Sequence, residues 1–170
     1  MKHTLSVLVE DRPGALARIS TMFARRAFNI ESLSVGPTEQ AGVSRITLRV
    51  DCTQHSLEQV EKQVHKLVNV LRVKELVPGE SIERELLLIK VAAVPDRRSE
   101  LISLANVFHA MAVDLGPEAI VFEVVGTPEE LESFQELVRP HGIKEIVRTG
   151  RVGMARASTR PAERRLSAID

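Results

Sequence analysis

The sequence predicts an α+β protein with two tandem domains, each an antiparallel sheet with helices on one face. Two observations lead to this prediction. Apolar residues recur at the two-residue spacing of strands and at the three-to-four-residue spacing of helices, and the two patterns alternate along the chain. The resulting order, βαββαβ, occurs twice and is that of ferredoxin-like domains. We therefore expect domains at residues 1–78 and 79–150, followed by a flexible basic tail at 151–170.

The first half contains four predicted strands and two predicted helices. Apolar and polar side chains alternate in four segments, which predicts strands at residues 4–9, 30–36, 43–51 and 70–77. The first helix should begin at Pro13, because the missing N–H of proline would be unpaired at the first helical position anyway. The second should begin after Ser56, which forms a capping-box pattern with Gln59.

The second half repeats this order. Apolar runs predict strands at residues 84–94, 111–115, 119–125 and 143–147. A helix follows the turn at residues 94–99, and another should start at Thr127. Thr127, Pro128 and Glu130 supply an N-cap, a proline at the first helical position and a capping-box carboxylate. After Gly150 the periodicity stops, which is why the tail is placed there.

Charge is distributed unevenly, although the formal net charge of the whole chain is zero. Residues 1–80 hold eleven Lys and Arg against nine Asp and Glu, residues 81–150 hold seven against twelve, and residues 151–170 hold five against two. With this balance and with no Trp or Tyr, we expect neither nucleic acid nor a membrane as a partner. The acidic second domain and the basic tail are where we expect another protein to dock.

No pattern typical of catalysis or metal binding is present. Cys52 is the single cysteine, which excludes an internal disulfide and a multi-cysteine metal site. The five histidines lack metal-ligand spacing (His3, His55, His65, His109 and His141). No apolar run approaches the roughly 20 residues that span a bilayer. We therefore expect a cytoplasmic chain that holds no metal or cofactor.

The first strand–helix turn is the most informative candidate site. Gly14 lets the backbone approach a ligand, and the free N–H groups of a helix N-terminus favour a carboxylate. Asp11 could accept hydrogen bonds from an ammonium group beside it. Together these groups suit a zwitterionic amino acid better than a phosphate, which the carboxylates of Glu10 and Asp11 would repel. The alternative is a plain turn in which Gly14 merely eases packing.

Asn29 follows the first helix and allows two interpretations. Asn tolerates the left-handed conformation of a C-terminal cap, so capping is the simpler interpretation. The other is that its side-chain amide contacts a ligand. In the second half, the corresponding turn at residues 94–99 has no glycine, which predicts that the second domain does not bind the amino acid.

Three stretches of the chain resemble a known family. They are Glu-Asp-Arg-Pro-Gly-Ala at residues 10–15, Asn-Ile-Glu-Ser-Leu at residues 29–33, and Glu-Arg-Glu-Leu-Leu-Leu-Ile-Lys-Val at residues 83–91. The chain resembles the small, regulatory subunit of acetolactate (acetohydroxyacid) synthase, whose N-terminal part is an ACT domain. The resemblance covers residues 2–155 and is most specific in the first 90.

The resemblance implies a non-catalytic subunit that is sensitive to a branched-chain amino acid, typically valine. Two ACT domains associate side by side in this family, and the effector binds between the first strand–helix loop of one chain and residues of the other. The positions implied to bind it are Asp11, Gly14, Ala15, Asn29 and Ile30. Many members have Asn where this chain has Asp11. Thiamine diphosphate, Mg²⁺ and FAD would be held by the catalytic large subunit, which the C-terminal domain would contact.

Two other functions remain as alternatives. One is a stand-alone amino-acid-binding ACT module that regulates a different enzyme or a transcription factor. The other is an enzyme on a ferredoxin-like scaffold, which the absence of a catalytic constellation disfavours. The sequence does not rank valine against leucine or isoleucine, because discriminating one methylene depends on the shape of the pocket.

Overall fold

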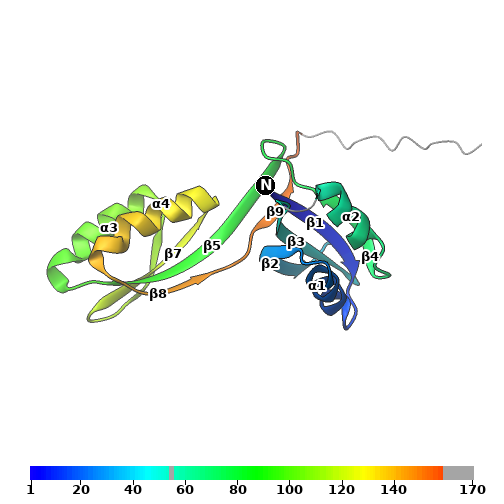
Figure 1. Ribbon diagram of the computed structural model, residues 1–170. Helices are drawn as coiled ribbons and strands as arrows, with labels where there is room; N and C mark the ends of the chain where they lie inside the picture. Colours follow the sequence, from blue (N-terminus) through cyan, green and yellow to red (C-terminus); the bar gives the residue numbers. More distant parts are fainter. Residues whose placement is uncertain (54–55, 159–170) are drawn as a thin grey trace, which may run out of the picture.

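A computed structural model of the chain describes residues 1–53 and 56–158. Figure 1 shows two domains that are joined by a long two-stranded ribbon. Each domain has the predicted βαββαβ order, so the prediction of two ferredoxin-like domains with antiparallel sheets is confirmed.

The N-terminal domain is a four-stranded sheet with two helices on one face (Figure 1). Its elements are β1 (Lys2–Glu10), α1 (Ala15–Arg25), β2 (Asn29–Pro37), β3 (Val43–Asp51), α2 (Leu57–His65) and β4 (Val70–Glu75). The strand order is β2-β3-β1-β4, and all neighbours are antiparallel. β2 is therefore an edge strand that pairs only with β3 among the described residues. As predicted, the Ser56 side chain caps α2 by accepting from the N–H of Gln59.

The C-terminal domain repeats the arrangement. Its elements are β5 (Ser81–Ala92), the 3-10 helix η1 (Pro95–Arg97), α3 (Arg98–Val107), β6 (Met111–Leu115), β7 (Ala119–Gly126), α4 (Pro128–Val138), η2 (Arg139–His141), β8 (Ile143–Arg148) and β9 (Val152–Ala155). The strand order is β6-β7-β5-β8, and β9 pairs with the first part of β5. The predicted capping box forms at the start of α4, where Thr127 and Glu130 bond reciprocally.

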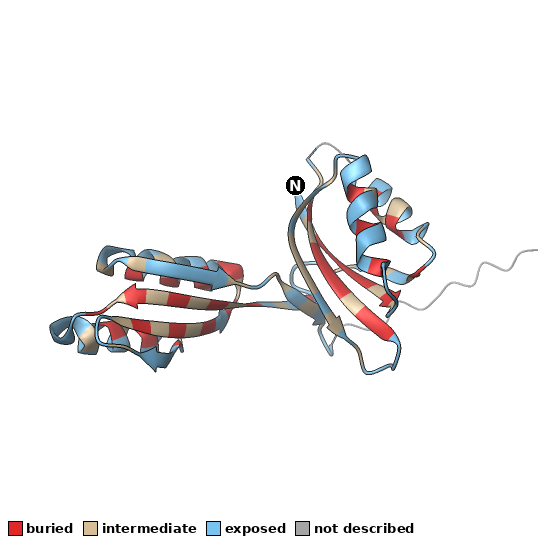
Figure 2. Cartoon of the chain, turned by 90° about the horizontal axis from the view of Figure 1, so that it is seen from below, coloured by how far each residue is buried: buried red, intermediate tan, exposed pale blue. Residues whose placement is uncertain are grey.

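Each domain has its own core between its sheet and its helices. Figure 2 shows buried and less buried residues alternating along the strands, because successive strand side chains point to opposite faces. In the first core, Phe23 meets Phe28 edge to face with ring centroids 5.7 Å apart. In the second, Phe134 packs against both Phe108 and Phe122. The five phenylalanines are thus used for packing.

The start of α1 differs from the prediction. The helix begins at Ala15, so Pro13 precedes it rather than occupying its first position. Gly14 is the N-cap and has a φ of +85°, a left-handed conformation that L side chains rarely adopt. A short turn before the helix explains the shift, since the N–H of Ala15 already bonds to the carbonyl of Arg12 at 3.2 Å.

The capping interpretation of Asn29 is wrong. The residue with positive φ after α1 is Ala27, at 54°, and Asn29 is the first residue of β2. The chain reverses within two residues of the helix end, because the N–H groups of Ala27 and Phe28 bond back to the carbonyls of Ala24 and Phe23. Asn29 is exposed there.

The expectation of a flexible tail from residue 151 is wrong for Val152–Ala155, which form β9. The physical reason is the exceptional length of β5, twelve residues, whose first four lie beyond β7 and β8 and offer free backbone groups. β9 pairs there in the register Ser81 to Ala155. The rest of the expected tail from residue 159 onward lies outside the described residues.

Candidate functional site

The turn between β1 and α1 presents backbone donors to solvent. No side chain caps α1 at Gly14, so N–H groups of its first turn beyond Ala15 remain available to a ligand. Gly14 and Asp11 are both exposed. The backbone of Asp11 is held, since its N–H bonds to the carbonyl of Gly42 at 2.8 Å. Its carboxylate has no bonding partner within the described part of the chain, so a ligand's ammonium group could use it.

A network around Glu10 fixes this turn. The Glu10 carboxylate lies 3.3 Å from Nε of Arg12 and accepts from the side-chain amide of Asn69 at 3.0 Å. The carbonyl oxygen of the Asn69 side chain accepts in turn from Arg18. Asn69 is only 9% exposed, and its backbone carbonyl accepts from the N–H of Glu10. The Glu10 carboxylate is thus occupied by Arg12 and Asn69, which leaves the Asp11 carboxylate available to a ligand.

Sequence reasoning missed Asn69 and Arg18 as residues that support the site. Asn69 lies 59 residues after Glu10, in the loop between α2 and β4, and only the fold brings the two together. The one local signal was an asparagine inside the apolar run from Leu67 to Val70. A polar residue in such a run is buried only when it is hydrogen-bonded.

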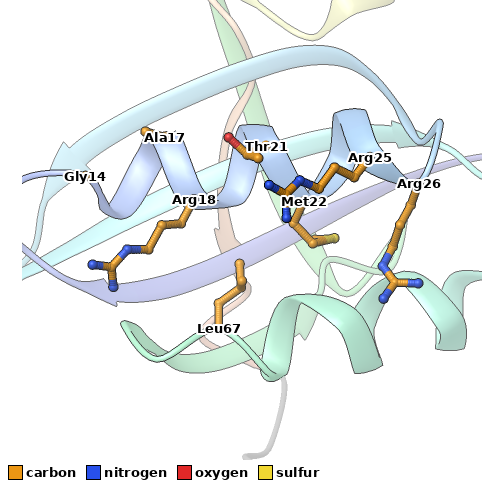
Figure 3. A pocket seen from close by; sticks show the side chains of 8 residues that line it. All are labelled: Gly14, Ala17, Arg18, Thr21, Met22, Arg25, Arg26 and Leu67. Atoms are coloured by element: carbon orange, nitrogen blue, oxygen red, sulfur yellow. The ribbon is translucent and has the colours of Figure 1, made fainter.

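A groove of about 760 Å³ begins at Gly14 and follows α1 toward the loop after α2. Figure 3 shows the side chains that line it, which come from α1 and its two ends and from Leu67. The lining residues are Gly14, Ala17, Arg18, Thr21, Met22, Arg25, Arg26 and Leu67. Three are arginines and none is acidic, so the groove favours an anionic group. Of the five predicted site residues, only Gly14 lines it.

The other predicted residues do not meet Gly14 within one chain. Asn29 and Ile30 lie at the start of β2, beyond the opposite end of α1. An eleven-residue helix is about 16 Å long, so one small amino acid cannot contact both ends. Ala15 is 8% exposed and belongs to the core, which leaves only its backbone for a ligand. The predicted site is therefore split into two halves.

The free edge of β2 offers a way to join these halves. β2 pairs with β3 along one side, and the described residues place no strand on the other. Exposed edge strands are templates for pairing with another chain. A second copy placed antiparallel along this edge would bring the Gly14 end of one α1 toward the Asn29 end of its partner.

The corresponding turn of the second domain has a different structure. It is the 3-10 helix η1, whose N-cap residue is Val94 in an extended conformation. The turn contains no glycine, so it lacks the left-handed residue that Gly14 provides at the start of α1. The guanidinium of Arg98 reaches across from α3 and donates to the carbonyl oxygens of Gly116 and Pro117. A protein side chain thus binds the loop next to this turn.

Cys52 is the single thiol of the chain and is partly buried. Burial raises the pKa of the Cys52 thiol, which leaves less of the nucleophilic thiolate at neutral pH. Among residues 1–53 and 56–158, no cluster of His, Cys, Asp and Glu has the geometry to hold a metal ion. None of the helices found there is long and apolar enough to cross a bilayer.

Comparisons with known proteins decide the family. Residues 5–72 match the family described as the AHAS small subunit-like ACT domain, and residues 84–157 match the family described as the small subunit of acetolactate synthase. The chain belongs to the acetolactate synthase small-subunit family. The N-terminal domain is therefore an ACT domain, and the two matches lie on either side of the boundary between the folded units.

Relatives and a solved structure agree with this assignment over nearly the full length. The acetolactate synthase small subunit of Mycolicibacterium smegmatis is 48% identical over 154 residues, which are 91% of each chain. The probable small subunit of Archaeoglobus fulgidus is 46% identical over 158 residues, covering 93% of this chain and 99% of its own length. The crystal structure of the Thermotoga maritima small subunit superimposes with a TM-score of 0.86 at 35% identity, covering 94% and 99% of the two chains.

Proposed function

We propose that this chain is the regulatory subunit of an acetolactate synthase. It activates the catalytic large subunit and inhibits it when a branched-chain amino acid, foremost valine, binds between two ACT domains. The observation that carries the proposal is the division of the candidate site. The donors at Gly14 and the groups at Asn29 lie at opposite ends of α1, and Asn29 begins β2, whose other edge pairs with no strand among the described residues.

Each half of the site has a chemical role. The amino acid's carboxylate accepts from the free N–H groups at the N-terminus of α1, where the helix dipole also favours negative charge. Its ammonium group donates to the unpartnered carboxylate of Asp11. The amide of Asn29 and the side chain of Ile30 come from the other protomer. The aliphatic side chain of the effector needs no aromatic platform, which fits a chain with neither Trp nor Tyr.

A ligand that binds between protomers can regulate without catalysis. It stabilises the arrangement of the two chains that it fits best, and a coupling of about 1–3 kcal/mol changes a partner's state by roughly 5–150-fold. In this proposal thiamine diphosphate, Mg²⁺ and FAD belong to the catalytic subunit, and this chain supplies only the allosteric site.

The second domain does not bind the amino acid in this proposal. Its turn at η1 lacks the left-handed glycine, and Arg98 donates to the carbonyls of the neighbouring loop. This domain has the acidic charge balance and is the one proposed to contact the catalytic subunit.

Reconstitution tests the proposal most directly. The purified chain is mixed with the catalytic subunit and pyruvate, with and without valine, and valine binding is measured separately by calorimetry. We expect this chain to have no turnover alone, to raise the rate of the catalytic subunit, and to lose that effect as valine binds. Turnover by the chain alone would support an enzyme. Amino-acid binding without any change in the partner's rate would support a stand-alone ACT module.

A further inference from the structure

The two domains are joined by two hydrogen-bonded strands rather than by a single linker. β5 pairs with β7 through Glu85–Ala92 and with β9 through Ser81–Arg84. β9 follows β8 in the chain, so both strands of the ribbon come from the second sheet and reach the ACT domain (Figure 1). Regular secondary structure of this kind can carry a displacement between distant sites.

Gly150, in the short link between β8 and β9 where the chain enters this ribbon, lies directly against β2. A Cβ at residue 150 would lie 2.6 Å from the carbonyl oxygen of Leu33 and 3.0 Å from its amide nitrogen, so only glycine fits without displacement. Leu33 is the fifth of nine residues in β2 and lies three residues after Ile30, a proposed effector contact. The edge strand that carries half of the proposed site therefore touches the ribbon backbone to backbone.

A chain of polar contacts runs beside this point, starting on β2. Nε of Arg49 lies 3.6 Å from Oε2 of Glu31, and the same guanidinium donates to the hydroxyl of Thr4 at 3.1 Å. The Thr4 hydroxyl lies 3.3 Å from Oε2 of Glu83 and donates to it. Thr4 is 1% exposed, so this contact lies in the interior between the ACT sheet and the ribbon.

Arg151 continues the chain of contacts into the second domain. It donates to Glu83 at 3.0 Å and to Glu85 at 3.1 Å, and Arg148 of β8 also donates to Glu85. Glu85 is 6% exposed, and the side chain of Arg151 is 17% exposed. Buried charges with several partners resist displacement, because any shift leaves a charge unpaired in a poorly solvated place.

We propose that Gly150 and Arg151 form a clamp that transmits occupancy of the effector site on β2 to the C-terminal domain. The proposal rests on the proposed function and names the route of its regulation. An effector that shifts β2 moves Leu33 against Gly150, and the Arg151 contacts pass the movement to β5, which is central in the second sheet. The domain proposed to contact the catalytic subunit then changes its position.

The first experiment tests the clamp without any effector. Spin labels are placed at Gln59→Cys on α2 and Asn106→Cys on α3 in a Cys52→Ser background, and the doubly labelled chain is diluted into unlabelled chain. We expect a single narrow distance distribution between the domains in the parent. Gly150→Ala should shift or broaden it because the new methyl group meets Leu33, and Arg151→Gln should broaden it because Glu83 and Glu85 lose a shared partner.

Gly36→Ala is the matched control. Gly36 also lies on β2, but a Cβ there meets nothing within 4 Å and its φ is not positive, so the distribution should stay that of the parent. Distributions for Gly150→Ala and Arg151→Gln that both match the parent would overturn the clamp. Circular dichroism melts show whether each variant is folded, and Arg151→Lys serves as a milder second variant at that position.

The second experiment measures coupling in the reconstituted enzyme. We expect both clamp variants to keep valine affinity within about twofold, while inhibition of the catalytic subunit weakens by about tenfold or more. Parental inhibition in variants whose distance distribution is broadened would overturn the regulatory role. If the unmodified chain neither binds valine nor alters the partner, the proposed function fails, and the spin-label distances alone then decide whether the clamp holds the domains.

Discussion

Gly14 has two separate properties that a substitution can test, its left-handed backbone and its missing side chain. We expect Gly14→Asp to abolish valine binding, because a carboxylate at this position repels the effector's own carboxylate and blocks the free N–H groups of α1. Calorimetry with the purified chain measures the loss. Gly79→Asp is the matched control, because Gly79 has a φ of +87° and open space around it but lies in the interdomain turn. Equal affinity in the Gly14 variant and the parent would remove Gly14 from the site.

Glu61 provides a prediction about pH. Burial raises the pKa of its carboxyl above the ordinary 4.5, and the nearby Glu75 adds to the effect. The folded state thus holds this proton more tightly than the unfolded state does. The stabilisation is complete below the unfolded pKa and is lost as pH rises through the folded pKa. At pH 7 the ionised group opposes folding, so Glu61→Gln should raise the melting temperature there, with the gain shrinking toward pH 4.

Glu58 on the same helix is the control for this effect. Its hydrogen bond from Lys62 lowers the pKa of the Glu58 carboxyl, which is the opposite direction. Glu58→Gln should therefore bring no gain at pH 7. Thermal melts of both variants between pH 4 and pH 8 make the comparison, and a Glu61→Gln protein that melts with the parent at pH 7 would contradict the assignment.

At the scale of elements, α4 depends on a local start signal. Thr127→Ala should destabilise the C-terminal domain by about 1 kcal/mol, because the N–H of Glu130 loses its acceptor and the reciprocal box is broken. Urea unfolding measures the change. Ser133→Ala removes a hydroxyl that bonds within the same helix to the carbonyl of Glu129, and it should be close to neutral. A similar loss from both variants would mean that the cap has no special role.

Local signals of this kind explain which elements the sequence could predict. Ser56 and Thr127 indicate where their helices begin, because an N-cap and its partner lie only three residues apart in the sequence. β9 was missed because four residues are too few for a period, and because its partner, the first part of β5, lies some 70 residues earlier in the chain. Pro13 placed the start of α1 too early, since the sequence contained no sign that Arg12 would accept from Ala15.

At the scale of the whole molecule, the sequence points to the turn around Gly14 as a candidate site, but it does not indicate how such a site would be assembled. The residues taken from the family pattern fall at both ends of α1, and their separation becomes visible only in three dimensions. The supporting contacts of Asn69 and the contacts of Arg151 with β5 also join residues more than 50 positions apart. Spacing along the chain holds no information about pairs of this kind.

The split site predicts complementation between two variants that each lose the response to the effector. Gly14→Asp should abolish effector binding, and Asn29→His should give resistance to the effector while partner activation is kept. In the proposed two-fold symmetric dimer, each site would take Gly14 from one chain and Asn29 from the other. A mixed dimer of the two variants then has one doubly altered site and one site with both original residues. Mixing equal amounts, with random exchange, should restore roughly a quarter of the parental binding sites.

Calorimetry measures the number of restored sites, and the affinity of each should equal that of the parent. The control is an equal mixture of the parent with the chain that carries both substitutions. Each mixed dimer in this control has one substitution in each of its sites, so only the parent homodimers bind, again with roughly a quarter of the sites. If both residues instead acted within one chain, the two single variants would restore no site, whereas the control mixture would keep about half of them. If the site is shared between protomers, the two mixtures therefore contain the same fraction of binding sites. If the site lies within one protomer, only the control mixture contains binding sites.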